Sequence, residues 1–192
     1  MASSESFMKS AFFGDIADGL LFPYPEMSEA EVDQLHLVLS SVRKFFAQNV
    51  DSKTIDREHV IPKNVLDGVK ELGLCGLLVP QDRGGVGLSA SAYARVMEEV
   101  GALDGSIAVT LGAHQSIGYK GLLLFGTDAQ KEKWLPKIAS GEVLPTAVFT
   151  EPNIGSDLAS IKTRAVREGS IYKVYGNKTW ITHPVRADLM TL

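Results

Sequence analysis

The spacing of hydrophobic residues changes near residue 144, and this change limits the possible folds more than any other feature. Between residues 29 and 48, apolar side chains recur at the spacing of one helix face: Val32, Leu35, Leu39, Val42 and Phe46. From Pro145 onward, alternating and β-branched residues take over. The sequence therefore predicts an α+β multidomain fold, in which an all-α helical bundle precedes the start of a β-barrel or β-sheet domain.

The same patterns divide the chain into three predicted parts. Residues 1–27 form an N-terminal extension, residues 28–144 a helical domain, and residues 145–192 the beginning of a β domain. In the extension, the prolines of the Phe-Pro-Tyr-Pro run at residues 22–25 favour an extended chain. We expect this run to pack across the outside of the bundle.

Capping boxes and periodic runs mark the individual elements. A capping box places a hydroxyl and, three residues later, an acid or amide at the start of a helix. Two such boxes, Ser28-Glu31 and Thr127-Gln130, predict helices that end at residues 48 and 140. Two more helices are predicted, one over residues 62–72 and a buried, apolar one over residues 106–125. Alternation predicts a strand over residues 170–175 that ends in a turn at Gly176-Asn177.

Composition argues against several classes of function. The net charge is −4 and basic residues form no patch, so we expect no nucleic-acid partner. Cys75 is the only cysteine and lies in an apolar run, which indicates a buried thiol and a reducing compartment. His114 has no second ligand at metal-binding spacing, so we expect a hydrogen-bonded core residue and no metal. No apolar run is long enough to span a membrane, and the N-terminus lacks the pattern of a secretory signal.

The run from Phe149 to Asp157, FTEPNIGSD, gathers groups suited to a flat ligand that bears phosphate. Thr150 and Ser156 supply hydroxyls beside a glycine and a row of backbone N–H groups. The segment Thr179–Thr182, TWIT, adds the aromatic plane of Trp180, and the intervening strand could bring the two runs together. Each run alone could be a plain turn, a loop or a core aromatic. Both runs in this order favour a cofactor site.

A second glycine-rich run, Gly84 to Ala90, formally contains the G-x-G-x-x-A pattern of dinucleotide-binding folds. Asp104 has the spacing of the supporting acid in such folds. However, Tyr93, Val96 and Val100 recur at helical spacing and leave no room for a second strand. A tight loop between two helices is therefore the favoured interpretation.

The TEPxxGSD run, followed by GxKxWIT at residues 176–182, resembles the flavin-binding middle region of the acyl-CoA dehydrogenases. The loop at residues 84–90 and the GTxxQKxxxLPxxASGE run from Gly126 look like the same family, and the Phe-Pro-Tyr-Pro run is similar to its very-long-chain branch. The resemblance implies FAD-dependent dehydrogenation of fatty acyl-CoA thioesters to trans-2-enoyl-CoA, as in fatty acid β-oxidation. A flavin would accept a hydride from the β-carbon while a glutamate removes the α-proton.

The resemblance also implies roles for individual residues. The implied cofactor-binding residues are Phe149 and Thr150 on the flavin ring, Ser156 between the pyrophosphate and the pantetheine arm, Trp180 with Ile181 against the ring, and Thr182 at its N5 side or phosphate. Gly112 and Ala113 would make room for the acyl chain, and Ser156 would also contact the substrate. Glu151 and Asp157 are expected to cap the loop rather than to transfer protons.

Further expectations concern the protein's context. The resemblance implies an electron-transfer flavoprotein as acceptor, a homo-oligomer, and a location in the bacterial cytoplasm or, after processing, the mitochondrial matrix. The catalytic base is expected beyond Leu192, so we expect a truncated β domain whose unpaired edge favours aggregation. The run His183 to Arg186 departs from the expected Asn-Gly-Gly type of turn. Two alternatives stay open, a non-catalytic helical binding module that retains the flavin motif and an acyl-CoA oxidase-like flavoprotein.

Overall fold

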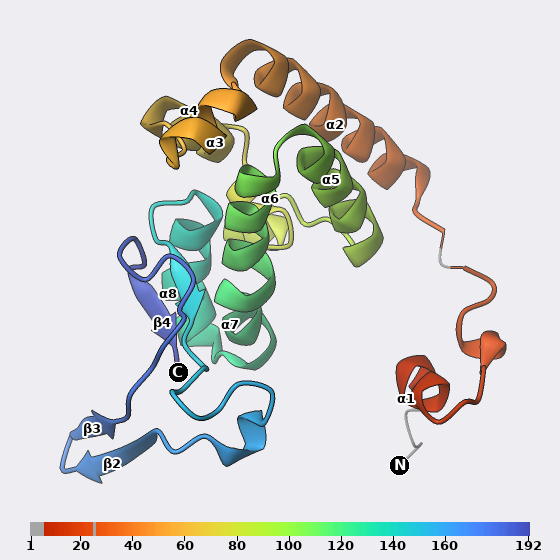
Figure 1. The fold of residues 1–192 in the computed structure, drawn as a ribbon. Helices are drawn as coiled ribbons and strands as arrows, with labels where there is room; N and C mark the ends of the chain where they lie inside the picture. Colours follow the sequence, from red (N-terminus) through yellow and green to blue (C-terminus); the bar gives the residue numbers. More distant parts are fainter. Residues whose placement is uncertain (1–5, 25) are drawn as a thin grey trace.

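The computed structural model describes residues 6–24 and 26–192, and Figure 1 shows a helical bundle that leads into short strands. The α-helices are α1 Phe7–Phe12, α2 Glu29–Asn49, α3 Ser52–Glu58, α4 Lys63–Glu71, α5 Ala90–Leu103, α6 Gly105–Gly112, α7 Lys120–Phe125 and α8 Asp128–Ala139. The π-helical segment η4 spans Ala113–Gly118, and the 3-10 turns are η1 Asp18–Leu20, η2 Leu74–Gly76, η3 Gln81–Arg83 and η5 Leu158–Ser160. The strands are β1 Pro145–Ala147, β2 Arg164–Glu168, β3 Ile171–Tyr175 and β4 Leu189–Thr191.

These elements confirm the predicted α+β fold class, with helices first and strands after them. The predicted helices at residues 29–48, 62–72 and 127–140 correspond to α2, α4 and α8. Helix α3 was not predicted, although Asp51 caps it by accepting hydrogen bonds from the N–H groups of Lys53 and Thr54. The last helix ends at Ala139 and the first strand begins at Pro145, while the domain boundaries themselves stay predictions.

The capping residues of α2 and α8 behave differently. Thr127 and Gln130 form the complete reciprocal box at the start of α8. Ser28 caps α2, but the Glu31 carboxylate accepts a hydrogen bond from Ser89 N, 2.8 Å away, instead of from its own cap. Hydrogen bonding from Ser89, first through its side chain and then through its N–H, lowers the pKa of Glu31. The predicted capping box at Ser28 and Glu31 is therefore half wrong. Ser28 caps α2 as predicted, whereas Glu31 joins the start of α2 to the start of α5.

The apolar core consists of two clusters. The first lies between α2, α4, α5 and α6, and it includes Val42, Val69, Val96 and Leu111. The second lies beneath α8 and contains Val79, Tyr119, Leu135, Ile138, Ala139 and Val143. The segment between α4 and α5 supplies residues to both clusters, so it connects the two halves of the bundle.

The stretch 106–125 differs from the single buried helix predicted for it. It is divided into α6, η4 and α7, and one side is exposed, with Val109 64% and Phe125 86% accessible. The end of η4 is closely approached at Gly118, where a Cβ atom would lie 2.8 Å from the carbonyl oxygen of Pro145. Strand β1 therefore passes directly over the end of η4, where only glycine fits.

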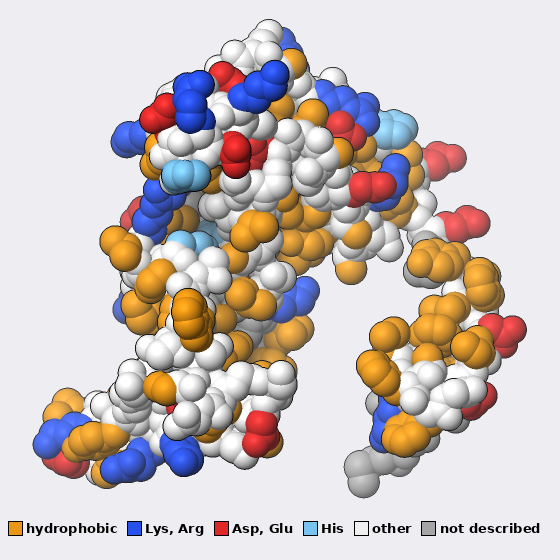
Figure 2. Space-filling model, viewed as in Figure 1, with side chains coloured by type: hydrophobic (Ala, Val, Ile, Leu, Met, Phe, Trp, Pro, Cys, Tyr) orange, Lys and Arg blue, Asp and Glu red, His pale blue; other side chains and the backbone are white. Residues whose placement is uncertain are grey.

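The N-terminal extension does not pack across the bundle, so that expectation is wrong. Figure 1 shows α1 and the segment after it standing apart from α2 to α8, and Figure 2 shows hydrophobic side chains over this arm. Phe12 is 85% exposed, and Phe22 and Tyr24 are also exposed. Pro25, the last residue of the Phe-Pro-Tyr-Pro run, lies outside the described residues.

The strands form two separate pairs. β1 and β4 pair in parallel, and β2 and β3 form an antiparallel hairpin whose turn includes Gly169 at φ +64°. The predicted strand at residues 170–175 is thus confirmed as β3, but the chain turns before it rather than at Gly176-Asn177. Every residue of β2 and β3 is exposed, so both faces of the hairpin lack cover from the described residues.

This exposure leads to a prediction about the 192-residue chain by itself. Because hairpin residues such as Val166, Ile171 and Val174 are exposed, we expect the isolated chain to self-associate. Size-exclusion chromatography with light scattering should give species heavier than the 20.7 kDa monomer. A monodisperse monomer at roughly 100 μM, within the range in which exposed surfaces drive aggregation, would contradict this prediction.

The glycine-rich run at residues 84–90 is a loop between η3 and α5, and the structure confirms that a helix, not a strand, follows it. Gly85 lies directly against residue 79, since a Cβ atom on Gly85 would be 2.0 Å from the Val79 carbonyl oxygen. Gly85 therefore serves close packing of the backbone, whereas Gly84 and Gly87 supply the positive φ angles of the loop.

Gly85→Ala should consequently destabilise the bundle. The methyl group would overlap backbone atoms, which costs about 2 kcal/mol or more. Thermal melting of the full-length protein should show a clear fall in melting temperature. Gly105→Ala is the matched control because no atom lies within 4 Å of the added carbon. Equal melting temperatures for the two variants would refute this account of the loop.

Candidate functional site

The two runs that the sequence analysis assigned to a cofactor site, residues 149–157 and 179–182, lie side by side in the structure. Strand β1 continues through Val148, whose N–H donates to Thr191 O at 2.8 Å, and the chain then reaches Phe149 and Thr150. The N–H of Thr179 donates to Thr150 O at 3.0 Å, and Lys178 Nζ donates to Phe149 O at 2.9 Å. The chain leaves this point through the β2–β3 hairpin and returns to it, so the hairpin joins the two runs.

Glu151 holds this junction together. Its carboxylate accepts hydrogen bonds from Lys162 N at 3.0 Å, Thr163 N at 2.9 Å and Thr163 Oγ1 at 2.6 Å, and it pairs with Lys178 Nζ at 3.1 Å. Glu151 is 7% exposed, and the Lys178 side chain is 12% exposed. Hydrogen bonds, first from the Thr163 hydroxyl and then from Lys162 N, lower the pKa of Glu151 to about 2. The side chain is therefore a fixed anion that fastens the loop, as the sequence analysis expected.

The rest of the first run forms an exposed turn. Glu151 and Ile154 exchange backbone hydrogen bonds of 2.9 and 3.0 Å, which closes a tight loop over Pro152 and Asn153. Ser156 is exposed beyond this loop, and no atom lies within 4 Å of the Cβ position of Gly155. Among the hydrogen bonds of residues 6–24 and 26–192, none uses the hydroxyl of Thr150, Ser156 or Thr182. These three hydroxyls are available to a ligand.

Trp180 presents its ring to solvent next to this junction. The side chain is 91% exposed, and the residue adopts the left-handed backbone conformation at φ +56°. Ile181 is half-buried, and Thr182 is fixed through its carbonyl oxygen, which accepts from Thr146 Oγ1 at 2.8 Å. An exposed indole on an anchored segment offers a flat apolar surface. The alternative that Trp180 is a core aromatic is wrong.

Gly112 and Ala113 lie at the junction of α6 and η4, and both are half-buried. A Cβ atom on Gly112 would lie 3.8 Å from Met97 Cε, so this glycine faces α5 at ordinary packing distance. The role of both residues in holding an acyl chain stays a prediction.

The neighbouring His114 and Cys75 are buried and inert. His114 Nε2 lies 3.1 Å from Ile138 O, as expected of a hydrogen-bonded core residue, and burial lowers its pKa to about 4. Burial raises the pKa of the Cys75 thiol to about 11. Across the part of the chain that the structure describes, no three His, Cys, Asp or Glu side chains cluster as metal ligands. None of the helices in those ranges is long and apolar enough to cross a bilayer.

The architecture defines the class of protein. A helical bundle runs directly into the first strands of a β domain, and the paired runs lie where the chain enters those strands. The sequence profile of the acyl-CoA dehydrogenase N-terminal domain matches residues 33–142. The chain therefore belongs to the acyl-CoA dehydrogenase family.

Individual relatives agree with this assignment. The very long-chain specific acyl-CoA dehydrogenase of Macaca fascicularis is 45% identical over the whole of this chain, and the alignment covers 30% of that protein. The (2S)-methylsuccinyl-CoA dehydrogenase of Cereibacter sphaeroides is also 45% identical, over 83% of this chain and 30% of its own length. A solved acyl-CoA dehydrogenase complexed with FAD, from Bacillus anthracis, superposes with a TM-score of 0.68 at 32% identity, covering 89% of this chain and 29% of that one. The chain thus spans under a third of the length of these relatives.

Proposed function

We propose that this chain supplies the entry to the flavin site of an enzyme that dehydrogenates fatty acyl-CoA thioesters to trans-2-enoyl-CoA. One observation carries the proposal. Lys178 and Thr179 bind the backbone of Phe149 and Thr150, so the hydroxyl-rich turn lies beside the segment that carries the exposed indole.

The residues at this surface fit FAD. The hydroxyls of Thr150, Ser156 and Thr182, which make no hydrogen bond to any described residue, suit the polar edge and the phosphates of the cofactor, and Trp180 suits the face of its ring. Phe149 and Thr150 would bind the ring edge, Ile181 and Thr182 would border the ring, and Ser156 would lie between the pyrophosphate and the substrate's pantetheine arm. When bound, FAD supplies a two-electron acceptor for the β-hydrogen of the substrate.

The chain's own residues orient and hold the ligands in this proposal. Glu151 is a poor candidate for the base because its carboxylate is occupied by four donors and its pKa is about 2. Its contribution is to fix the turn on which Thr150 and Ser156 stand. The proton acceptor for the α-carbon is proposed to be a different carboxylate, beyond Leu192.

Anaerobic titration of the full-length protein with a long-chain acyl-CoA tests the proposal. The purified protein should be yellow, and the flavin absorbance near 450 nm should bleach on addition of substrate, the signature of flavin reduction. A colourless protein that ignores acyl-CoA would support the non-catalytic binding module instead. Bleaching followed by peroxide release in air would move the assignment to an acyl-CoA oxidase-like flavoprotein.

The finer details of the reaction belong to the same proposal. Long acyl chains are the proposed substrates because the Macaca relative is named for very long-chain substrates. An electron-transfer flavoprotein is the proposed acceptor, and a homo-oligomer is the proposed assembly. The proposed location is the bacterial cytoplasm or the mitochondrial matrix, and the Macaca relative is described as mitochondrial.

A further inference from the structure

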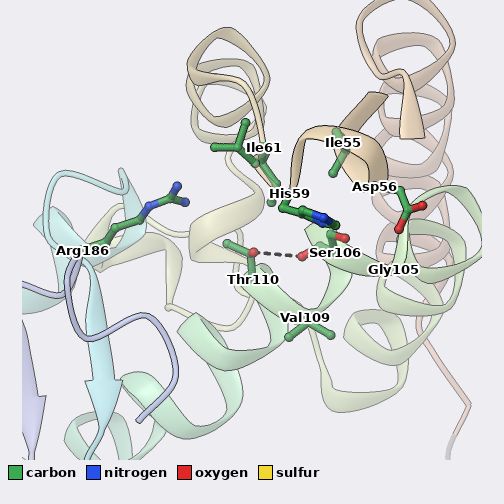
Figure 3. A pocket seen from close by; sticks show the side chains of 10 residues that line it. Ile55, Asp56, His59, Ile61, Gly105, Ser106, Val109, Thr110 and Arg186 are labelled. Carbon is green, nitrogen blue, oxygen red and sulfur yellow. Dashed lines mark hydrogen bonds between the residues drawn. The ribbon is translucent and has the colours of Figure 1, made fainter. Parts of the chain in front are cut away.

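A cleft of about 720 Å³ separates α3 and the segment after it from α6, away from the paired runs. Figure 3 shows Ile55, Asp56 and His59 along one side, Ser106, Val109 and Thr110 of α6 along the other, and Arg186 at one end. Four aliphatic side chains, Ile55, Val60, Ile61 and Val109, line the cleft together with polar ones. A cleft that combines aliphatic side chains with polar groups can hold a small molecule that has both an apolar and a polar part.

Arg186 is the distinctive group in this cleft. Its guanidinium group offers five N–H donors, and none of the ion pairs among residues 6–24 and 26–192 includes it. The one acidic residue that lines the cleft, Asp56, lies at the opposite end in Figure 3. The cleft is therefore polarised, with an unpaired cation at one end and an anion at the other.

A second, smaller cavity of about 90 Å³, which Lys70 also lines, lies beside the positive end. Thr110 and Arg186 line both spaces, so the small cavity adjoins the cleft at the arginine. Its other ionisable residues are Lys70, Cys75, His114 and His183, and no carboxylate lines it. Leu66, Val69 and Leu144 make the remaining wall apolar. No carboxylate therefore lines the small cavity itself, and the nearby Asp188 carboxylate is held by the N–H of Leu144 at 2.9 Å.

We propose that this cleft binds the carboxylate of an organic acid at Arg186, with the hydrocarbon part of the acid lying along Ile61 and Val109. Arginine presents two parallel N–H groups that match the two oxygens of a carboxylate. An apolar tail suits the aliphatic walls, and Asp56 disfavours a second carboxylate at the far end. A phosphate without a hydrocarbon part would leave those walls uncovered.

The carboxylate can come from two sources. It is either a free acid that binds separately from the substrate or the far end of an acyl-CoA whose acyl group bears a carboxylate. The first source is independent of the dehydrogenase activity proposed above, whereas the second rests on it.

Calorimetric titration of the full-length protein with hexanoate and with neutral hexanamide tests the site without flavin chemistry. Hexanoate should bind more tightly than hexanamide. Arg186→Gln should weaken the affinity for hexanoate by about 10-fold or more, as expected for a lost hydrogen bond to a charged group, and should leave the affinity for hexanamide unchanged. Val109→Asp should weaken hexanoate as well, because it places an anion in the apolar wall. Lys173→Gln, which removes a positive charge from the β2–β3 hairpin, is the matched control and should change nothing.

Turnover of adipoyl-CoA and hexanoyl-CoA by the same variants identifies the source. If the unchanged protein turns over adipoyl-CoA faster than hexanoyl-CoA, and Arg186→Gln abolishes this preference, the carboxylate belongs to the acyl group. Weakened hexanoate binding with unchanged turnover of both thioesters would assign it to a free acid. The proposal falls if hexanoate and hexanamide bind equally well, or if Arg186→Gln leaves their difference intact.

Discussion

Gln115→Leu is expected to destabilise the protein by about 3 kcal/mol or more. Gln115 is fully buried in η4, where its Oε1 accepts from Leu77 N at 3.0 Å and from the Tyr119 hydroxyl at 3.1 Å. Its Nε2 donates to Leu74 O at 2.9 Å. Leucine has a similar shape but would leave three buried polar groups unpaired, and each costs about 1–3 kcal/mol. Thermal melting of the full-length protein measures the loss.

Gln34→Leu provides the matched control for this prediction. Gln34 makes one side-chain hydrogen bond, from Nε2 to Val86 O at 3.2 Å, and is half-buried, so its loss should cost about 1 kcal/mol. If the two variants melt at the same temperature, Gln115 does not hold η2 against η4 as described. The effect should extend to the flavin surface, because β1 crosses η4 at Gly118 and leads into Phe149.

Glu151→Gln is expected to weaken FAD binding by about 10-fold or more, the size of effect seen when a charged hydrogen-bond acceptor is lost. A carboxylate offers two acceptor oxygens to Lys162 N, Thr163 and Lys178, whereas an amide turns one of its two positions into a donor. At least one of these donors would then face an N–H group. The Lys178 ammonium, which is mostly buried, would also lose its counter-charge.

Equilibrium titration of the apoprotein with FAD, followed by flavin fluorescence, measures this change. Glu168→Gln is the control, since it removes an exposed carboxylate that pairs with Lys173 at 2.6 Å on the hairpin. Its FAD affinity should match that of the unchanged protein. Unaltered affinity in Glu151→Gln would show that the turn does not depend on this carboxylate.

The pH dependence of FAD binding follows from the same group. The pKa of Glu151 is lowered from 4.5 to about 2, so its hydrogen bonds to the turn stabilise the fold at every pH above 4.5. That stabilisation is lost as the pH falls from 4.5 through 2, where the folded-state carboxylate takes up a proton. The titration of Glu151 should therefore not change the FAD affinity of the protein between pH 8 and pH 5. Over the same range, Glu151→Gln should bind FAD more weakly than the unchanged protein.

Local sequence patterns predicted most of the helices because they depend on neighbours in the chain. The hydrophobic period of α2 and the box at Thr127 and Gln130 act within one helix, and both matched the structure. The single helix predicted over residues 106–125 was wrong, because the spacing of apolar residues carries no signal for the π-helical segment η4 or for the distant Pro145 that lies against Gly118. The N-terminal arm was misjudged because aromatic composition does not specify the surface that covers it.

The candidate site shows the same division between local and distant information. The motifs at residues 149–157 and 176–182 identified the two runs, and Lys178 belongs to the second motif. Thr163, which donates twice to Glu151, lies outside both motifs and carries no sequence signal of its own. In the sequence, Arg186 was noted only because residues 183–186 differ from the expected Asn-Gly-Gly type of turn. Its position at a cleft depends on how α3, α6 and residues 183–186 pack together, which the sequence does not show.

A crystal structure of the full-length protein with FAD is the most direct test of the paired runs as a flavin surface. The account predicts the isoalloxazine ring against the Trp180 side chain, with Thr150 at the ring edge and Ser156 near the pyrophosphate. FAD bound elsewhere, with Trp180 and Thr150 both free of the cofactor, would contradict it.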